Sequence, residues 1–436
     1  MANLGDLKDT KSNAHQVLIL AHADKDANHG IDVNMRIAVV NLLMRTVRSR
    51  HFVPQLDRDL PTKGVRADSP MAVLLADEFA KVGHDVDIFV GSMFDVVRDA
   101  EKFQGKRASI VYVKEGLRWI FPPSAYPFAP SAISRLKKDH YDVILTTELV
   151  QPCTLAALAV RPNKARIFVW QELASHPRFP ASSYSKFVFS LSRINRFRRM
   201  EKIIPRSESA RCFLLSEGVP ESKISQIIPN GVDCRTFTPE QPYDFFRKNG
   251  LGNPPRPRTI MVARIDSRKG IETFLEAAKI ALANGHEGSF VLKVTGSGIA
   301  YVQNLAASLG VKDKVVIVGE YIPRKELANL MASCDICAAP SSGDLLFFVP
   351  LEAMACGLPV ITTARTHHAA TFSDGRAGLL IPHNDSKALA EAIVGLNRDR
   401  QKLRQMAAAA RDLAVREFSI ESVARRFVGE FERECA

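Results

Sequence analysis

Short apolar runs separated by longer amphipathic stretches recur along most of the chain. The run QVLILAH occupies 16–22, and the alternating segment HDVDIFVG occupies 84–91. Between them, residues 70–82 place apolar side chains at helical spacing. Strands that alternate with helices predict parallel sheets covered by helices on both faces. The pattern therefore predicts an α/β protein with doubly wound parallel sheets.

The alternation of strands and helices is interrupted at 236–257, a stretch rich in Pro and Gly. We interpret this stretch as an interdomain linker. We expect one Rossmann-like domain over 1–235 and a second over 258–415. Residues 416–436 predict an amphipathic helix, capped by Ser419, that packs back on the N-terminal domain. Ligands of open parallel sheets bind beyond the carboxyl ends of the strands, so we expect a site in a cleft where the two domains face each other.

The segment 23–69 does not fit this alternation of strands and helices, because only a short loop is expected between the first strand and the first long helix. Part of it, MRIAVVNLLMRTVRSR at 35–50, predicts an extra helix, and the rest is polar. The residues around its start, HADKDANH at 22–29, include His22 and Asp24, but the spacing matches no metal-site rule. We interpret this cluster as a solvated loop.

The net charge of +12 and the pI of about 9.4 suit an anionic partner. The N-terminus is polar, and no apolar run reaches the roughly 20 residues that span a bilayer. These features predict a cytoplasmic protein without a membrane span. Seven dispersed cysteines argue against a disulfide framework, and we interpret Cys334 and Cys337 as core residues rather than a zinc or redox pair.

One segment, 184–206, concentrates arginine and lysine between apolar residues. As a helix it would be amphipathic and cationic, which suits peripheral contact with an anionic membrane, here the inner face. The alternative is a packed helix with a solvated cationic face. Nucleic acid is not expected as a partner because no DNA- or RNA-binding motif accompanies the charge.

Two segments of the second domain carry the chemistry. In VARIDSRKG, at 262–270, Arg264 and Lys269 follow a strand and precede a helix, where cations and free N–H groups suit a diphosphate. Gly296 stands in a second glycine loop that offers main-chain donors. In PSSGDLLFFVPLEAMACG, at 340–357, Asp344 and Glu352 can accept hydrogen bonds from sugar hydroxyls. Together they predict a nucleotide-sugar pocket.

These segments resemble the retaining GT-B glycosyltransferases of glycosyltransferase family 4. The resemblance rests on IIPNGVD, VARIDSRKGIETFLEAA, VTGSG, PSSGDLLFFVPLEAMACGLPVITT and GRAGLLIPHNDSKALAEAI, which occur in the family's order across the C-terminal half. It implies two Rossmann-like domains and a UDP- or GDP-linked sugar as donor, with no cofactor and no metal.

The resemblance also assigns roles by position. It implies that Arg264 and Lys269 bind the donor diphosphate and that Asp344 and Glu352 are the two acids of the E-x7-E motif. Other matched positions are those expected to contact the phosphates or the base: Gly64, Gly296, Tyr321 and Ile322. The catalytic set implied is Asp344, Arg264 and Lys269. In the retaining reaction the protein contributes mainly positioning and charge stabilisation.

The chain departs from the family pattern at several positions of the expected site, namely Asp344, Leu345, Phe347, Gln171 and Ala370. Gln171 replaces an acceptor-domain histidine, and Glu172 supplies an acid one place later. We therefore expect a hexosyltransferase acting in glycan, lipopolysaccharide or glycolipid biosynthesis, with two alternatives. One is a nucleotide-sugar epimerase or hydrolase of the same fold, and the other is a non-catalytic nucleotide-binding homologue.

Overall fold

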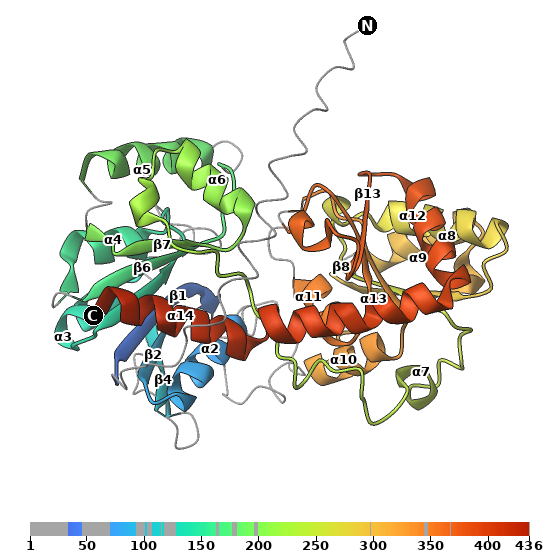
Figure 1. The fold of residues 1–436 in the computed structure, drawn as a ribbon, viewed down its shortest axis with the longest axis horizontal. Helices are drawn as coiled ribbons and strands as arrows, with labels where there is room; N and C mark the ends of the chain where they lie inside the picture. Colours follow the sequence, from blue (N-terminus) through green and yellow to red (C-terminus); the bar gives the residue numbers. More distant parts are fainter. Residues whose placement is uncertain are drawn as a thin grey trace, which may run out of the picture. The chain divides into compact units, whose positions relative to one another are not determined.

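Two parallel β-sheets with helices against their faces form the structure, a computed structural model (Figure 1). It describes residues 34–45, 70–92, 101–102, 107–114, 116, 128–162, 165–176, 181–195, 199–296, 298–343, 348–366 and 368–435. The predicted α/β class with two parallel-sheet domains is confirmed. QVLILAH at 16–22 and the cluster with His22 and Asp24 lie outside the described residues.

The N-terminal sheet has the strand order β3-β4-β2-β1-β5-β6-β7, and among these described strands only the short β3 runs antiparallel. Its strands are β1 (Arg36–Arg45), β2 (Asp85–Ser92), β3 (Glu101–Lys102), β4 (Ala108–Lys114), β5 (Val143–Thr147), β6 (Arg166–Gln171) and β7 (Lys202–Pro205). The helices of this domain are α2 (Pro70–Lys81), α3 (Pro130–Lys138), α4 (Pro152–Val160), α5 (Ala181–Asn195) and α6 (Glu208–Ser216).

The expected extra helix within 35–50 is wrong, because Arg36–Arg45 forms the central strand β1. Ile37 pairs with Val86 of β2 on one side and Val143 of β5 on the other. The side chains at 37–40 are all buried, since both faces of this strand are covered. Such a continuous apolar run cannot be distinguished from a buried helix by periodicity, and its β-branched residues favour the strand.

The C-terminal sheet is parallel throughout, in the order β10-β9-β8-β11-β12-β13. Its strands are β8 (Arg258–Arg264), β9 (Ser289–Thr295), β10 (Val315–Val318), β11 (Ile336–Ala339), β12 (Val360–Thr363) and β13 (Gly378–Ile381). The helices are α7 (Phe245–Lys248), α8 (Ile271–Ala283), α9 (Ile299–Ser308), α10 (Arg324–Ala332), α11 (Phe348–Ala355), α12 (Ser386–Arg398) and α13 (Arg400–Leu413).

The segment 236–257 packs into the C-terminal domain instead of crossing solvent. Phe237, Phe245 and Phe246 are buried in the core that α10 and α11 share. Its Asp244 pairs with the buried Arg258 at 2.8 Å. Although the segment is rich in Pro and Gly, its three phenylalanines bury substantial apolar area and fix it to the domain.

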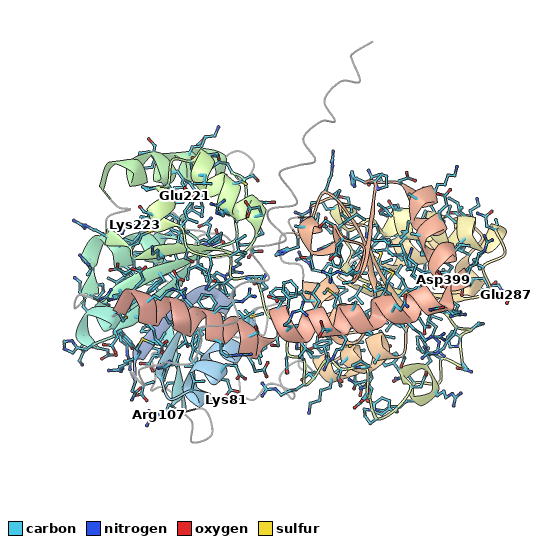
Figure 2. All side chains as sticks on the ribbon, viewed as in Figure 1. Lys81, Arg107, Glu221, Lys223, Glu287 and Asp399 are labelled. Carbon is cyan, nitrogen blue, oxygen red and sulfur yellow. The ribbon has the colours of Figure 1, made fainter. Side chains whose placement is uncertain are left out.

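The last helix, α14 (Ile420–Cys435), packs on the N-terminal domain against α2. Phe427 and Phe431 contact Phe79 of α2 edge to face, with ring centroids 6.1 and 5.9 Å apart. Ser419 caps this helix by accepting from the Ser422 N–H at 3.2 Å, as expected. On the exposed end of α2, Lys81, labelled in Figure 2, pairs with Asp77 and Glu78.

The basic segment 184–206 is not one helix, contrary to expectation. The helix α5 ends at Asn195, and β7 begins at Lys202 because Ile203 and Ile204 enter the sheet and are fully buried. Arg199 donates to the carbonyl of Ala159, and Lys202 pairs with Glu434 at 3.2 Å. These cations of the segment therefore stabilise the fold through contacts within the domain. Within the described part of the chain, no helix is both long and apolar enough to cross a bilayer.

Candidate functional site

The carboxyl end of β8 presents an exposed arginine, Arg264. Next to it, Asp266 accepts two hydrogen bonds from the Arg268 guanidinium, at 3.0 and 2.7 Å, and one from its N–H. These hydrogen bonds hold the pKa of Asp266 well below its usual value. Arg268 thus pairs with Asp266, whose pKa the Arg264 charge also lowers, and the Arg264 side chain forms no hydrogen bond or ion pair with any residue that the structure describes. Its guanidinium remains available for an anion.

The loop that carries Lys269 is fixed against the segment after β11. The carbonyl of Arg268 accepts from the Ser341 hydroxyl at 3.1 Å and from the Ser342 N–H at 2.8 Å. Gly270 follows with φ +76°, and a Cβ there would lie 2.4 Å from the Pro340 carbonyl oxygen. The two chemistry-bearing segments predicted from the sequence, 262–270 and 340–357, are therefore in direct contact.

Gly270→Ala should destabilise the protein by about 2–3 kcal/mol, because it adds a steric clash to a left-handed backbone conformation. Gly285 is the matched control: its φ is +78°, but nothing lies within 4 Å of a built Cβ. Gly285→Ala should cost only about 1 kcal/mol. Urea unfolding of both variants measures the difference, and equal losses would show that contact with Pro340 is unimportant.

A second glycine loop lies beside the first at the same sheet edge. Ile265, next to Arg264, donates its N–H to the carbonyl of Thr295 at the end of β9. Gly296 and Gly298 then adopt positive φ, and α9 begins at Ile299. The helices α8 and α9 thus both begin at this edge, where unpaired N–H groups and the helix dipole favour anions.

Tyr321 and Ile322 lie between β10 and α10. Tyr321 is half exposed, and Ile322 packs partly buried against the core. Lys293, buried in β9, donates to the carbonyl of Glu320 at 2.7 Å and so fixes the start of this segment. Burial lowers the pKa of Lys293 to about 8. The sequence does not mark this lysine as buried, because a lysine in a strand is usually solvent-facing.

Glu352 lies on α11 and is buried, with a relative exposure of 5%. Its Oε1 pairs with the Arg324 guanidinium at 3.0 Å. Burial raises the pKa of Glu352, and the charge of Arg324 opposes that shift. The other acid of the expected pair, Asp344, lies outside the described residues, as do Leu345, Phe347 and Gly64.

Three strands of the N-terminal sheet also converge on a buried polar cluster. Glu148 follows β5 with φ 60° and accepts from the Glu172 N–H at 2.6 Å and from the Gln171 side chain at 2.9 Å. Glu172 in turn pairs with Arg206, which follows β7, at 2.9 Å. Because the strands are parallel, their carboxyl ends bring these residues to one edge.

In this cluster Gln171 has a structural role. It is fully buried, and its Oε1 accepts from the Leu149 N–H at 2.9 Å while its Nε2 donates to Glu148. Desolvation, with the Glu172 charge second, raises the pKa of Glu148 to about 7. Arg206 lies 3.7 Å above the Trp170 ring. Sequence reasoning missed Glu148 and placed Arg206 in a surface-exposed basic segment.

A cavity of about 650 Å³ opens near the same edge, beside α6. Its polar lining includes His176, Glu208, Ser209, Cys212 and Glu217. His176 contacts the Ser185 hydroxyl at 2.9 Å and Glu217 at 3.2 Å, so it is held in place. Hydroxyl and carboxylate groups of this kind suit a polyol ligand.

Two family models match this chain. Residues 71–236 match the model described as Glycosyltransferase Family 4, and residues 243–413 match the model described as Glycosyl transferases group 1. Together they cover well over half of the 436 residues. The chain belongs to the family 4 glycosyltransferases.

Curated relatives of this family 4 glycosyltransferase include proteins of polysaccharide biosynthesis. The putative colanic acid biosynthesis glycosyltransferase WcaL of Salmonella typhimurium is 26% identical over 53% of this chain and 56% of its own length. The lipopolysaccharide core biosynthesis mannosyltransferase LpsB of Rhizobium meliloti is 28% identical over 54% of this chain and 66% of its own length. The chain thus spans about half to two thirds of the length of these relatives. The MMP alpha-(1->4)-mannosyltransferase of Mycolicibacterium hassiacum is 25% identical over 83% of this chain and 93% of its own length.

Solved structures share the fold of this family 4 glycosyltransferase at low identity. A glycosyltransferase from Rickettsia africae has a TM-score of 0.70 and 18% identity, covering 92% of this chain and 98% of that one. HepE of Anabaena, in complex with UDP and glucose, has a TM-score of 0.65 and 17% identity, covering 92% and 100%. The expected GT-B architecture of two parallel-sheet α/β domains is thereby confirmed.

Proposed function

We propose that the protein is a retaining hexosyltransferase that moves a sugar from a UDP- or GDP-linked donor to an acceptor hydroxyl. The observation that carries this proposal is the exposed Arg264 at a sheet edge where two helices begin, with its neighbour Asp266 already neutralised. A leaving diphosphate needs such a site, because charge accumulates on it in the transition state.

Each predicted residue has a role in this proposal. Arg264 and Lys269 hold the diphosphate, with the N–H groups at Gly296 and Gly64 beside it. Tyr321 and Ile322 contact the base, and Glu352 accepts from the ribose. Asp344 lies by the donor sugar. The acceptor hydroxyl attacks on the face from which the diphosphate departs, and a phosphate oxygen takes its proton. The anomeric configuration is thereby retained, and the reaction needs no metal.

The acceptor belongs to glycan, lipopolysaccharide or glycolipid biosynthesis in this proposal. The printed names of two relatives, which refer to colanic acid and lipopolysaccharide core, support that range. The open cavity beside α6 includes hydroxyls and carboxylates that can contact a saccharide. On α5, Lys186 is exposed and Phe187 is 61% exposed, which suits peripheral contact with the inner face of an anionic membrane.

Sugar transfer can be tested with purified protein and a panel of UDP-, GDP- and ADP-linked hexoses, each with oligosaccharide or glycolipid acceptors. Acceptor-dependent release of the nucleoside diphosphate, with a product anomer matching the donor by NMR, supports the proposal. Release of free sugar or an epimer without an acceptor would indicate hydrolysis or epimerisation instead. Nucleotide binding without any turnover would identify a non-catalytic homologue.

A further inference from the structure

The ribose-side carboxylate of the proposed site has an unusual partner. Glu352 has only 6% of its side-chain surface exposed, yet its Oε1 lies 3.0 Å from an Arg324 guanidinium nitrogen. Arg324 is the first residue of α10, two positions after Ile322. Nothing in the E-x7-E motif or in the expected diphosphate pair requires this arginine. The geometry connects the segment expected to contact the base with the carboxylate expected to bind the ribose.

The arginine is itself held in place. Its guanidinium carbon lies 4.9 Å from the centroid of the Phe237 ring, and Phe237 is fully buried. A guanidinium packed on an aromatic ring loses little further freedom when it pairs with a carboxylate. Arg324 is 41% exposed at its side chain, so it lies between solvent and the buried acid.

Other ionisable groups around Glu352 cannot replace this cation. The Glu352 charge acts on the thiols of Cys337 on β11 and of Cys356, the residue after α11, and burial raises the pKa of both. Arg411 of α13 is directed to main-chain oxygens, donating to the carbonyls of Phe237, Ala355 and Cys234. Among the described residues, Arg324 is the cation that pairs with Glu352.

We propose that Arg324 is a positioning residue for the nucleotide, whose guanidinium keeps the buried Glu352 carboxylate charged and oriented to accept hydrogen bonds from the ribose diol. The inference rests on the proposed function, because it takes Glu352 as the ribose ligand. An ionised carboxylate accepts from both hydroxyls of a vicinal diol, whereas a protonated one has lost part of that capacity. Without its cation, a buried carboxyl takes up a proton more readily.

The test is calorimetric titration of UDP and GDP into wild type and Arg324→Met at pH 6, 7.5 and 9. If the loss of Arg324 lets Glu352 take up a proton more readily, affinity in the variant should fall at pH 6, by up to about tenfold, and recover toward wild type at pH 9. Arg324→Lys should restore most of the affinity. Lys325→Met, which removes the exposed neighbouring cation on the same helix, is the control and should bind as wild type does.

A second variant distinguishes an effect on the charge of Glu352 from a purely structural effect of the substitution. Glu352→Gln, which cannot ionise, should bind weakly at every pH, and adding Arg324→Met to it should weaken binding no further. An equal loss at all three pH values in Arg324→Met, or wild-type affinity in that variant, would overturn the positioning role. If wild type itself binds neither UDP nor GDP, the proposed function fails as well.

Discussion

Arg264→Ala should lower kcat/KM for sugar transfer about 100-fold or more. Arg264 is exposed at the end of β8 and forms no ion pair with a described residue, so its removal leaves the fold intact but the leaving diphosphate poorly neutralised. Removing a single preorganised charge-stabilising donor typically costs 10²–10³ in rate. Steady-state kinetics with the donor identified by the panel measures this effect.

Two further variants separate chemistry from overall charge. Arg264→Lys keeps the charge but loses the paired N–H groups of the guanidinium, so it should recover only part of the rate. Arg376→Ala removes another exposed cation, which pairs with Asp374 before β13, and it should leave the rate within about twofold. A similar loss in Arg264→Ala and Arg376→Ala would indicate a non-specific charge effect.

Arg206→Met should destabilise the protein by about 3–5 kcal/mol, the usual cost of stranding a buried charge. Arg206 is 8% exposed and pairs with Glu172 at 2.9 Å, and its charge also acts on Glu148. Arg211→Met is the control, because Arg211 pairs with Glu208 and Glu221 at the surface and should cost less than about 1 kcal/mol. Equal losses in these two variants would contradict the buried-cluster interpretation.

The loss of stability in Arg206→Met should be larger at high pH than at low pH. Glu148 has an ordinary pKa of 4.5 and a folded-state pKa of about 7. The folded state therefore binds a proton at Glu148 more tightly than the unfolded state does. The stability that this proton contributes is fully present below pH 4.5 and is lost as the pH rises through 7. Without Arg206 the pKa of Glu148 rises further, so the variant should be more strongly destabilised at pH 8 than at pH 5. Adding Glu172→Gln should recover part of the loss at pH 8. Equal destabilisation at both pH values would contradict this account.

Much of the C-terminal half could be predicted from its sequence. The apolar runs at 258–264 and 290–296, and those that follow, become strands of one parallel sheet, because each is short and ends at a polar or glycine-rich loop. The same pattern placed both Arg264 and Lys269 in the loop after the first of these strands; Arg264 is instead the last residue of β8, and Lys269 lies in the turn before α8. The contact between Gly270 and Pro340, and the neutralisation of Asp266 by Arg268, required the structure.

Elsewhere local pattern was insufficient for physical reasons. Residues 37–40 of β1 are buried on both faces, so this part of the strand lacks the alternation that identifies strands. Arg206 belongs to a cation-rich stretch, and composition alone cannot tell which cation turns inward to Glu172. Glu148 meets its partners across more than 20 residues of sequence, through strand pairing. The pairing of Arg324 with Glu352 is likewise a tertiary contact that neither segment indicates by itself.

The most direct test of the central claim is calorimetric titration of nucleoside diphosphates and the matching monophosphates into wild type and an Arg264→Ala, Lys269→Ala double variant. If these two cations hold the diphosphate, wild type should bind UDP or GDP at least tenfold more tightly than UMP or GMP. The double variant should lose that preference while keeping the weaker monophosphate binding. A preference for diphosphates that survives unchanged in the double variant would contradict the account.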